Sequence, residues 1–76
     1  MSWTNCMKNK IVGHYGSEIK HCVDGITKHN WTEILECMVT VLGITDPEIW
    51  IPKQLILFAT WSIECIFTLR LEQAKK

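Results

Sequence analysis

The segment from residue 52 to residue 71 constrains the fold most, because it reads as one long helix that is apolar on nearly every side. At helical spacing its residues fall into three stripes. The stripes are Leu55, Phe58, Ala59, Ser62, Ile66 and Leu69; Ile56, Ile63 and Phe67; and Leu57, Trp61 and Leu71. A helix of this kind has to be surrounded. Because a 76-residue chain can cover only part of it, we expect another copy or another protein to cover the remainder.

Two shorter helices are predicted before residue 29. The first helix has Ser2 as a possible cap, and its apolar residues recur every four positions from Trp3. It is predicted to end at Val12 or Gly13. Ser17 caps the second, over 17 to 28, whose apolar stripe is Ile19, Cys22, Val23 and Ile26. If glycine is tolerated at 13 and 16, the two form one kinked rod.

The third helix is predicted over 31 to 42. Asn30 and Glu33 resemble a capping box, and Gly43 is a natural stop. Its apolar stripe is Trp31, Ile34, Leu35, Met38, Val41 and Leu42. Asp46 can cap a further turn with Pro47 at the first helical position. Pro52 favours a break before the long helix, with Trp50 and Ile51 anchoring the corner, although one bent helix is the alternative.

No segment shows the sustained alternation of a strand, and length allows one domain at most. The predicted fold is therefore all-α: a single helical domain over 1–76, built as a bundle of three to four helices with a long C-terminal helix. Net charge is zero, which removes the self-repulsion that keeps proteins apart. We expect the bundle to be a homo-oligomer.

The eight basic and eight acidic residues are scattered along the chain, so no basic face for phosphates is predicted. The helix over 31 to 42, as the second helix of a helix-turn-helix, carries Glu33 and Glu36 and would repel DNA. Nucleic acid is therefore an unexpected partner. A DNA-binding regulator stays as an alternative if the side chains of Lys8, Lys10, Lys20 and Lys28 come together.

A membrane-associated helix is the other alternative. The uncharged run from Leu55 to Ile63 is bounded by Lys53 and Glu64. That window is far shorter than the roughly 20 apolar residues that span a bilayer. The segment also lacks the strongly polar face of an interfacial helix. We therefore do not expect a membrane partner.

The four cysteines are widely separated. Polar residues interrupt the apolar ones near the N-terminus, so no signal-peptide core is predicted there. This combination predicts free thiols in a reducing compartment, and hence a cytoplasmic protein. The cysteines then act as small hydrophobic residues, and no catalytic role is expected for them.

No metal site, cofactor or enzyme activity is predicted. The first half of the chain contains six potential zinc ligands, yet no two have the spacing that places ligands within one local turn. They are Cys6, His14, His21, Cys22, His29 and Cys37. His21 and Cys22 are adjacent, so on a helix they should diverge by about 100°.

The function predicted by elimination is that of a non-enzymatic interaction protein, of the adaptor or inhibitor type, that associates with itself and binds a protein partner. The expected interface residues are Leu57, Trp61, Phe58, Ile63, Phe67 and Leu71. Trp61 is expected to anchor that interface and Trp31 to lie in the core. Compact chains of this kind are often viral or phage accessory proteins, an expectation that rests on no residue of this one.

Overall fold

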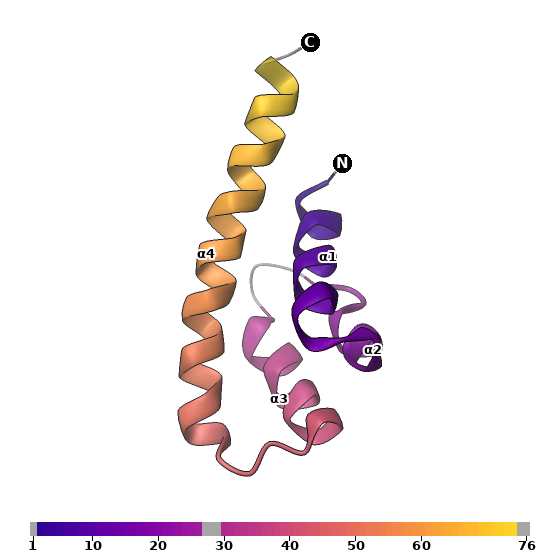
Figure 1. Cartoon of the computed structure of the whole chain (residues 1–76), viewed down its shortest axis with the longest axis vertical. Coiled ribbons are helices and arrows are strands. Elements are labelled where there is room, and N and C mark those ends of the chain that lie inside the picture. The colour runs from indigo at the N-terminus through magenta and orange to yellow at the C-terminus, as the bar shows by residue number, and fades with distance from the viewer. Residues whose placement is uncertain (1, 27–29, 75–76) are drawn as a thin grey trace.

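The computed structural model describes residues 2–26 and 30–74. Its elements are α1 (Trp3–Tyr15), a 3-10 turn η1 (Ser17–Ile19), α2 (Lys20–Val23), α3 (Trp31–Leu42) and α4 (Pro47–Ala74). No strand occurs in the described ranges, so the predicted all-α bundle with a long C-terminal helix is confirmed. In Figure 1, α4 runs along one side of the molecule, and α1, α2 and α3 all lie on the other side of it.

Helix α1 begins as predicted but ends later. The Ser2 hydroxyl accepts a hydrogen bond from the Asn5 backbone N–H at 3.1 Å, which caps the first turn. The predicted end at Val12 or Gly13 is wrong, because the helix continues to Tyr15. It stops at Gly16, whose φ of 96° suits glycine and whose N–H donates to the Val12 carbonyl at 2.8 Å.

The second predicted helix is much shorter than its apolar stripe suggested. Residues 17 to 23 form η1 and α2, and Asp24 is already extended. Gly25 then turns the chain with a φ of 80°, which a continuing helix does not allow. Ile26 nevertheless reaches the core, so the stripe is buried although its last member is not helical. The rest of the predicted helix lies outside the described residues.

Helix α3 has the predicted bounds, and Gly43 ends it in the left-handed conformation with a φ of 69°. The predicted capping box is wrong in one respect. Asn30 occupies the cap position, but its side-chain amide donates to the Gly25 carbonyl at 3.3 Å and does not cap the helix.

Helix α4 is continuous through Pro52, so the predicted break is wrong. The Asp46 carbonyl accepts from the N–H groups of Ile49 and Trp50, which fixes the first turn at the predicted start. Proline at 52 removes only one backbone hydrogen bond. Trp50 and Ile51 pack against the core, and this packing holds the first turns in line with the rest of the helix.

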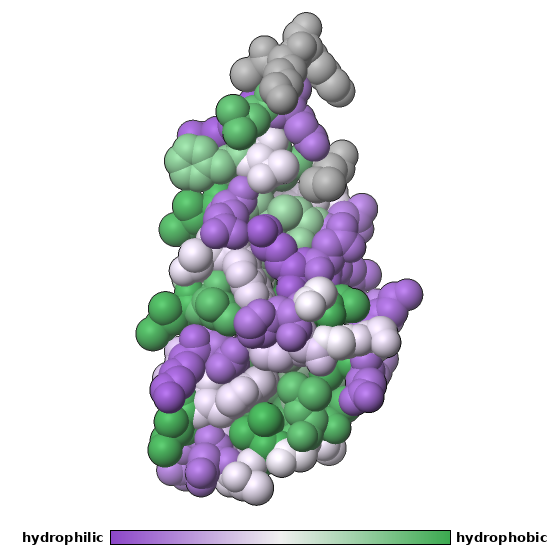
Figure 2. All heavy atoms as spheres, in the orientation of Figure 1, coloured by the Kyte–Doolittle hydropathy of each residue, from purple (hydrophilic) through white to green (hydrophobic). Residues whose placement is uncertain are grey.

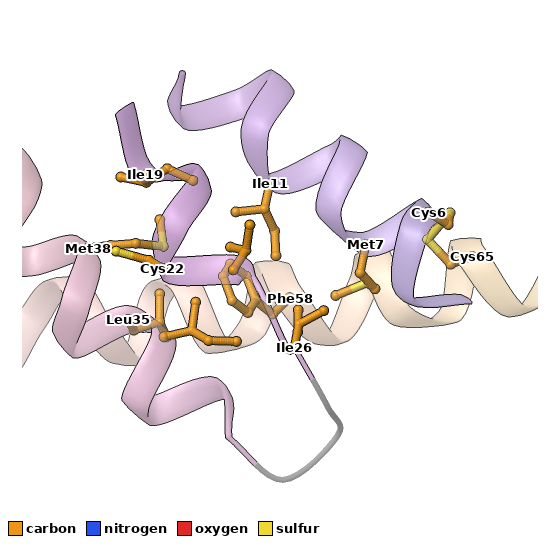
Figure 3. Packing of buried hydrophobic residues seen from close by; sticks show 12 residues of the cluster. Cys6, Met7, Ile11, Ile19, Cys22, Ile26, Leu35, Met38, Phe58 and Cys65 are labelled. Carbon is orange, nitrogen blue, oxygen red and sulfur yellow. A yellow bond between two sulfur atoms is a disulfide. The ribbon is translucent and has the colours of Figure 1, made fainter. Parts of the chain in front are cut away.

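The core lies between α4 and the other three helices. Among the described residues, twelve are buried in it, and they come from every element: Cys6, Met7, Ile11, Ile19, Cys22, Val23, Ile26, Ile34, Leu35, Met38, Phe58 and Cys65. Phe58 of α4 lies among residues of α1, α2 and α3 (Figure 3). Trp31 packs edge-on against Phe58 with ring centroids 6.0 Å apart and is half-buried, in line with its predicted place in the core.

Candidate interaction surface

Five large apolar side chains form a row along the outside of α4. Ile49, Ile56, Ile63, Phe67 and Leu71 are each between 57% and 71% exposed, and we call them the outer row. In Figure 2, hydrophobic residues line the edge of the molecule formed by α4, interrupted by hydrophilic ones. Isolated apolar side chains are common on protein surfaces, whereas a contiguous row usually marks a binding surface.

The outer row follows a seven-residue spacing. Ile49, Ile56 and Ile63 are seven residues apart and therefore stand nearly above one another on one face. Ala59 and Ile66, three residues after the second and third isoleucines, are exposed beside them. This is the a and d spacing of a helix that packs against another helix.

Charges of both signs border the row. On a helical wheel, Glu48 and Arg70 lie on one flank near opposite ends, and Lys53 lies on the other flank. All three are exposed. An anionic membrane or a nucleic acid favours a basic border, whereas this mixed border suits a partner that also carries both signs.

The six predicted interface residues differ in how far they are buried in the structure. Ile63, Phe67 and Leu71 belong to the outer row, and Leu57 is half-buried. Phe58 is fully buried within the chain, so its predicted place in an interface is wrong. The prediction joined residues from opposite faces because all three stripes are apolar, and composition alone cannot tell which stripe the other helices cover.

Trp61 is half-buried and packs inside the chain. Its ring stacks on Phe58 with centroids 5.7 Å apart and meets the rings of His14 and Tyr15 edge-on at 5.3 and 6.1 Å. These contacts account for Trp61 without a partner, so its predicted role as an interface anchor has no support in its surroundings.

Sequence reasoning left Ile49 and Ile56 out of the interface. Ile56 was already in one stripe with Ile63 and Phe67, and the seven-residue interval to Ile63 was the signal that could have selected it. Ile49 was excluded because the helix was expected to begin only at Pro52. The continuity of α4 through Pro52 extends the row by a full heptad.

The cysteines are paired, and the prediction of free thiols is wrong. Cys6 of α1 is bonded to Cys65 of α4, and Cys22 of α2 to Cys37 of α3. Sequence separations of 59 and 15 residues concealed both pairs, since pairing depends on proximity in the folded chain. Disulfides persist in oxidising compartments. The cytoplasmic location stays a prediction, but the cysteines no longer support it.

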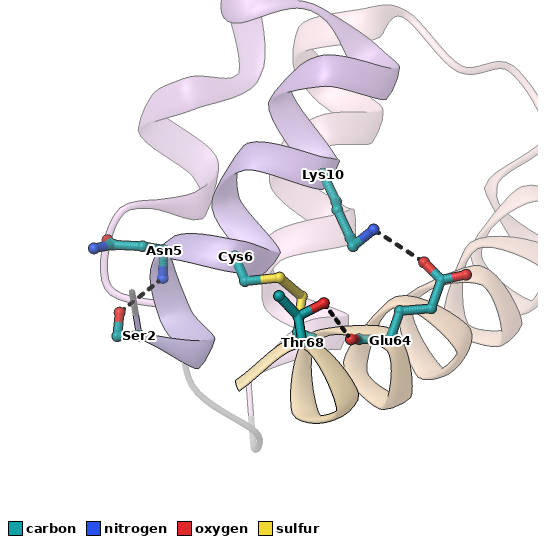
Figure 4. The surroundings of a disulfide bond; sticks show 7 residues. Ser2, Asn5, Cys6, Lys10, Glu64 and Thr68 are labelled. Atoms are coloured by element: carbon teal, nitrogen blue, oxygen red, sulfur yellow. Dashed lines mark hydrogen bonds and ion pairs between the residues drawn. A yellow bond between two sulfur atoms is a disulfide. The ribbon is translucent and has the colours of Figure 1, made fainter. Parts of the chain in front are cut away.

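The Cys6–Cys65 disulfide fixes α1 along α4. Beside it, the Lys10 ammonium pairs with the Glu64 carboxylate at 3.0 Å, and the Thr68 hydroxyl donates to the Glu64 carbonyl at 3.0 Å (Figure 4). Lys8 pairs with Asp24 at 3.4 Å. Two of the four lysines required by a DNA-binding alternative therefore face acidic partners, and a third, Lys28, lies outside the described residues.

Tyr15 joins the end of α1 to α4. Its hydroxyl donates a hydrogen bond to the Gln54 side-chain oxygen, and its ring meets Trp50 and Trp61 edge-on. Burial raises the pKa of Tyr15 from 10.0 to about 12, because the charged phenolate loses solvation there.

Three potential metal ligands come together, contrary to the predicted divergence of His21 from Cys22. One ligand atom from each of His21, Cys22 and Cys37 lies within 4.8 Å of the other two. The His21 Nε2 atom is 3.7 Å from the Cys22 Sγ atom. Of the other predicted candidates, His14 lies against Trp61, Cys6 is bonded to Cys65, and His29 lies outside the described residues.

By length and composition, one helix of the described chain, over Pro47–Glu72, could cross a membrane. Only 11% of its most apolar stretch is buried. Comparisons with family models, curated proteins and solved structures found no match to this chain.

Proposed function

We propose that this chain is a non-enzymatic helical interaction protein that associates with itself through the outer row of α4 and binds a protein partner. The exposure of this row carries the proposal. Burying the exposed part of each side chain should contribute about 1 kcal/mol or more, and the five side chains lie on one continuous face. A row of this length and spacing fits another helix.

The border of the row favours a second copy, paired antiparallel, as the occupant. In such a pair the same flanks meet with their ends reversed. Glu48 of one copy then lies near Arg70 of the other, at both ends of the interface. Opposite charges placed this way add little affinity but fix the orientation of the two helices.

A membrane-associated protein is the second candidate, because α4 is long and apolar. Two observations favour association over a membrane span. Polar α1 lies along α4, held by the Cys6–Cys65 disulfide. The Lys10–Glu64 pair would also enter the hydrocarbon, where each charge costs about 2.5 kcal/mol or more.

Sedimentation equilibrium tests the proposal. We expect the wild-type chain to form dimers at micromolar concentration and Ile56→Glu to weaken the dimer about 30-fold, corresponding to about 2 kcal/mol. Thr40→Glu, at an exposed position of α3, is the matched control. Glu48→Arg should weaken the dimer, and Glu48→Arg combined with Arg70→Glu should restore it.

A folded wild-type monomer at these concentrations would contradict self-association. If that monomer also floats with lipid vesicles, and Ile56→Glu abolishes flotation, the membrane candidate replaces it. A dimer that resists Ile56→Glu would show that another face associates, and a dimer that the double charge reversal does not restore would rule out the antiparallel arrangement.

A further inference from the structure

The strongest group of chemically active side chains lies away from the outer row, where α2 meets α3. It consists of His21 and Cys22 from α2 and Cys37 from α3. The Cα atoms of the two cysteines are 5.7 Å apart, so both sulfur atoms can reach one point. His21 is exposed, Cys22 is buried, and Cys37 is half-buried.

The His21 ring lies close to the Cys22 sulfur although the two residues are neighbours on the single turn of α2. A regular helix separates neighbouring side chains by about 100°. Helix α2 has four residues and ends at an extended Asp24. Within this single turn the imidazole lies over the Cys22 sulfur, with Nε2 3.7 Å from Sγ. The three donor atoms therefore already share one small volume.

We propose that these three residues form a zinc site once the Cys22–Cys37 disulfide is reduced by a protein or small-molecule dithiol. The dithiol breaks the S–S bond by exchange, becomes a disulfide itself and leaves Cys22 and Cys37 as thiols. Zn²⁺ then displaces one proton from each thiol and accepts a lone pair from His21 Nε2. No other electron donor is needed.

The donor set suits zinc. Thiolate and imidazole are its usual ligands, and two cysteines with one histidine leave the fourth tetrahedral position for water or an external ligand. His21 is exposed, so water can reach the site from its side. Harder cations such as Mg²⁺ and Ca²⁺ prefer oxygen ligands and should not compete.

Zinc would preserve the link between α2 and α3 in a reducing compartment. The disulfide and the metal use the same two sulfur atoms and therefore exclude each other. The Cys6–Cys65 pair differs, because no third metal ligand accompanies it in the described part of the chain. Reduction should thus remove the covalent link between α1 and α4, while zinc keeps α2 attached to α3.

Titration with Co²⁺, a spectroscopic substitute for zinc, tests the site. The full chain carrying Cys6→Ala and Cys65→Ala is reduced with a phosphine, which contributes no thiol of its own. We expect one Co²⁺ per chain, with thiolate-to-cobalt absorption that Zn²⁺ removes, and no such absorption in the oxidised protein. Adding His21→Ala should weaken binding at least about tenfold, since even indirect partners of a metal contribute that much, whereas His14→Ala should leave it unchanged.

The reduced chain with its natural cysteines gives a second measurement, should the double variant fail to fold. Zinc should raise its melting temperature through binding to the folded state, and His21→Ala should reduce that rise. Equal cobalt affinity of the reduced and oxidised proteins, or of His21→Ala and His14→Ala, would overturn the inference.

Discussion

The two faces of α4 carry the same spacing and have opposite surroundings. Ile51, Phe58 and Cys65 follow one another at seven-residue intervals on the inner face, and Ile49, Ile56 and Ile63 do so on the outer face. Phe58 and Cys65 are fully buried, while the outer three are more than half exposed. Periodicity therefore identifies faces that prefer burial, but the size of the chain decides how many it can bury by itself.

The largest effect that tests this comparison is expected at the inner face. Phe58→Ala should lower the free energy of unfolding by about 3 to 5 kcal/mol, because it leaves a cavity among α1, α2 and α3. Ile56→Ala, two residues away on the outer face, should change the stability of the monomer by no more than about 0.5 kcal/mol. Denaturant unfolding of dilute protein measures both. Similar losses at the two sites would mean that the faces do not differ as described.

Trp61 lies at the border between the two faces and should behave as a core residue. Trp61→Ala removes its stacking on Phe58 and should lower the free energy of unfolding by about 2 kcal/mol, less than at a fully buried aromatic residue. The sedimentation behaviour should change little, since the outer row stays intact. If Trp61→Ala dissociated the dimer without lowering the melting temperature, the tryptophan would belong to the interface after all.

The smallest expected effect is a pH dependence of stability at Tyr15, which packs against the inner side of α4. Its pKa is about 12 in the folded chain and near 10 when exposed. The folded state therefore binds the phenolic proton more tightly, and this contribution to stability is complete below pH 10 and is lost as pH rises towards 12. Tyr15 is the chain's single tyrosine, so ultraviolet absorption of the phenolate follows its titration directly.

Tyr15→Phe is the control for that measurement. It should cost a modest amount of stability at neutral pH, through the lost hydrogen bond to Gln54, and should remove the part of the alkaline stability loss that follows the phenolate signal. A phenolate signal that rises near pH 10 in the folded protein would contradict burial of this group.

Local signals in the sequence predicted α3 and the start of α1, because the residues that end or cap these helices lie within four positions of the groups they serve. Gly43 adopts the left-handed turn and Ser2 caps Asn5. The continuity through Pro52 depends on the packing of Trp50 and Ile51 against the core, so local propensity could not decide it. Both disulfides depend entirely on such distant contacts.

The candidate surface was only partly predictable for the same reason. The three apolar stripes of the long helix indicated a need for cover, and three of the predicted interface residues, Ile63, Phe67 and Leu71, are exposed. Choosing between Phe58 and Ile56 required knowing where α1 and α3 pack. The approach of His21 to two cysteines likewise depends on where α3 brings Cys37, which no local pattern could place.

The pairing of Cys6 with Cys65 also has a topological consequence, because it closes nearly the whole chain into a covalent ring. Cutting one peptide bond anywhere between those residues opens the ring but releases no fragment. A cut between Cys22 and Cys37 leaves two pieces joined by both bridges, since the second disulfide spans the same interval. A nicked molecule would thus lose no fragment until reduced and would gain only the mass of one water. New chain ends could be introduced between α2 and α3 without separating the helices that form the core.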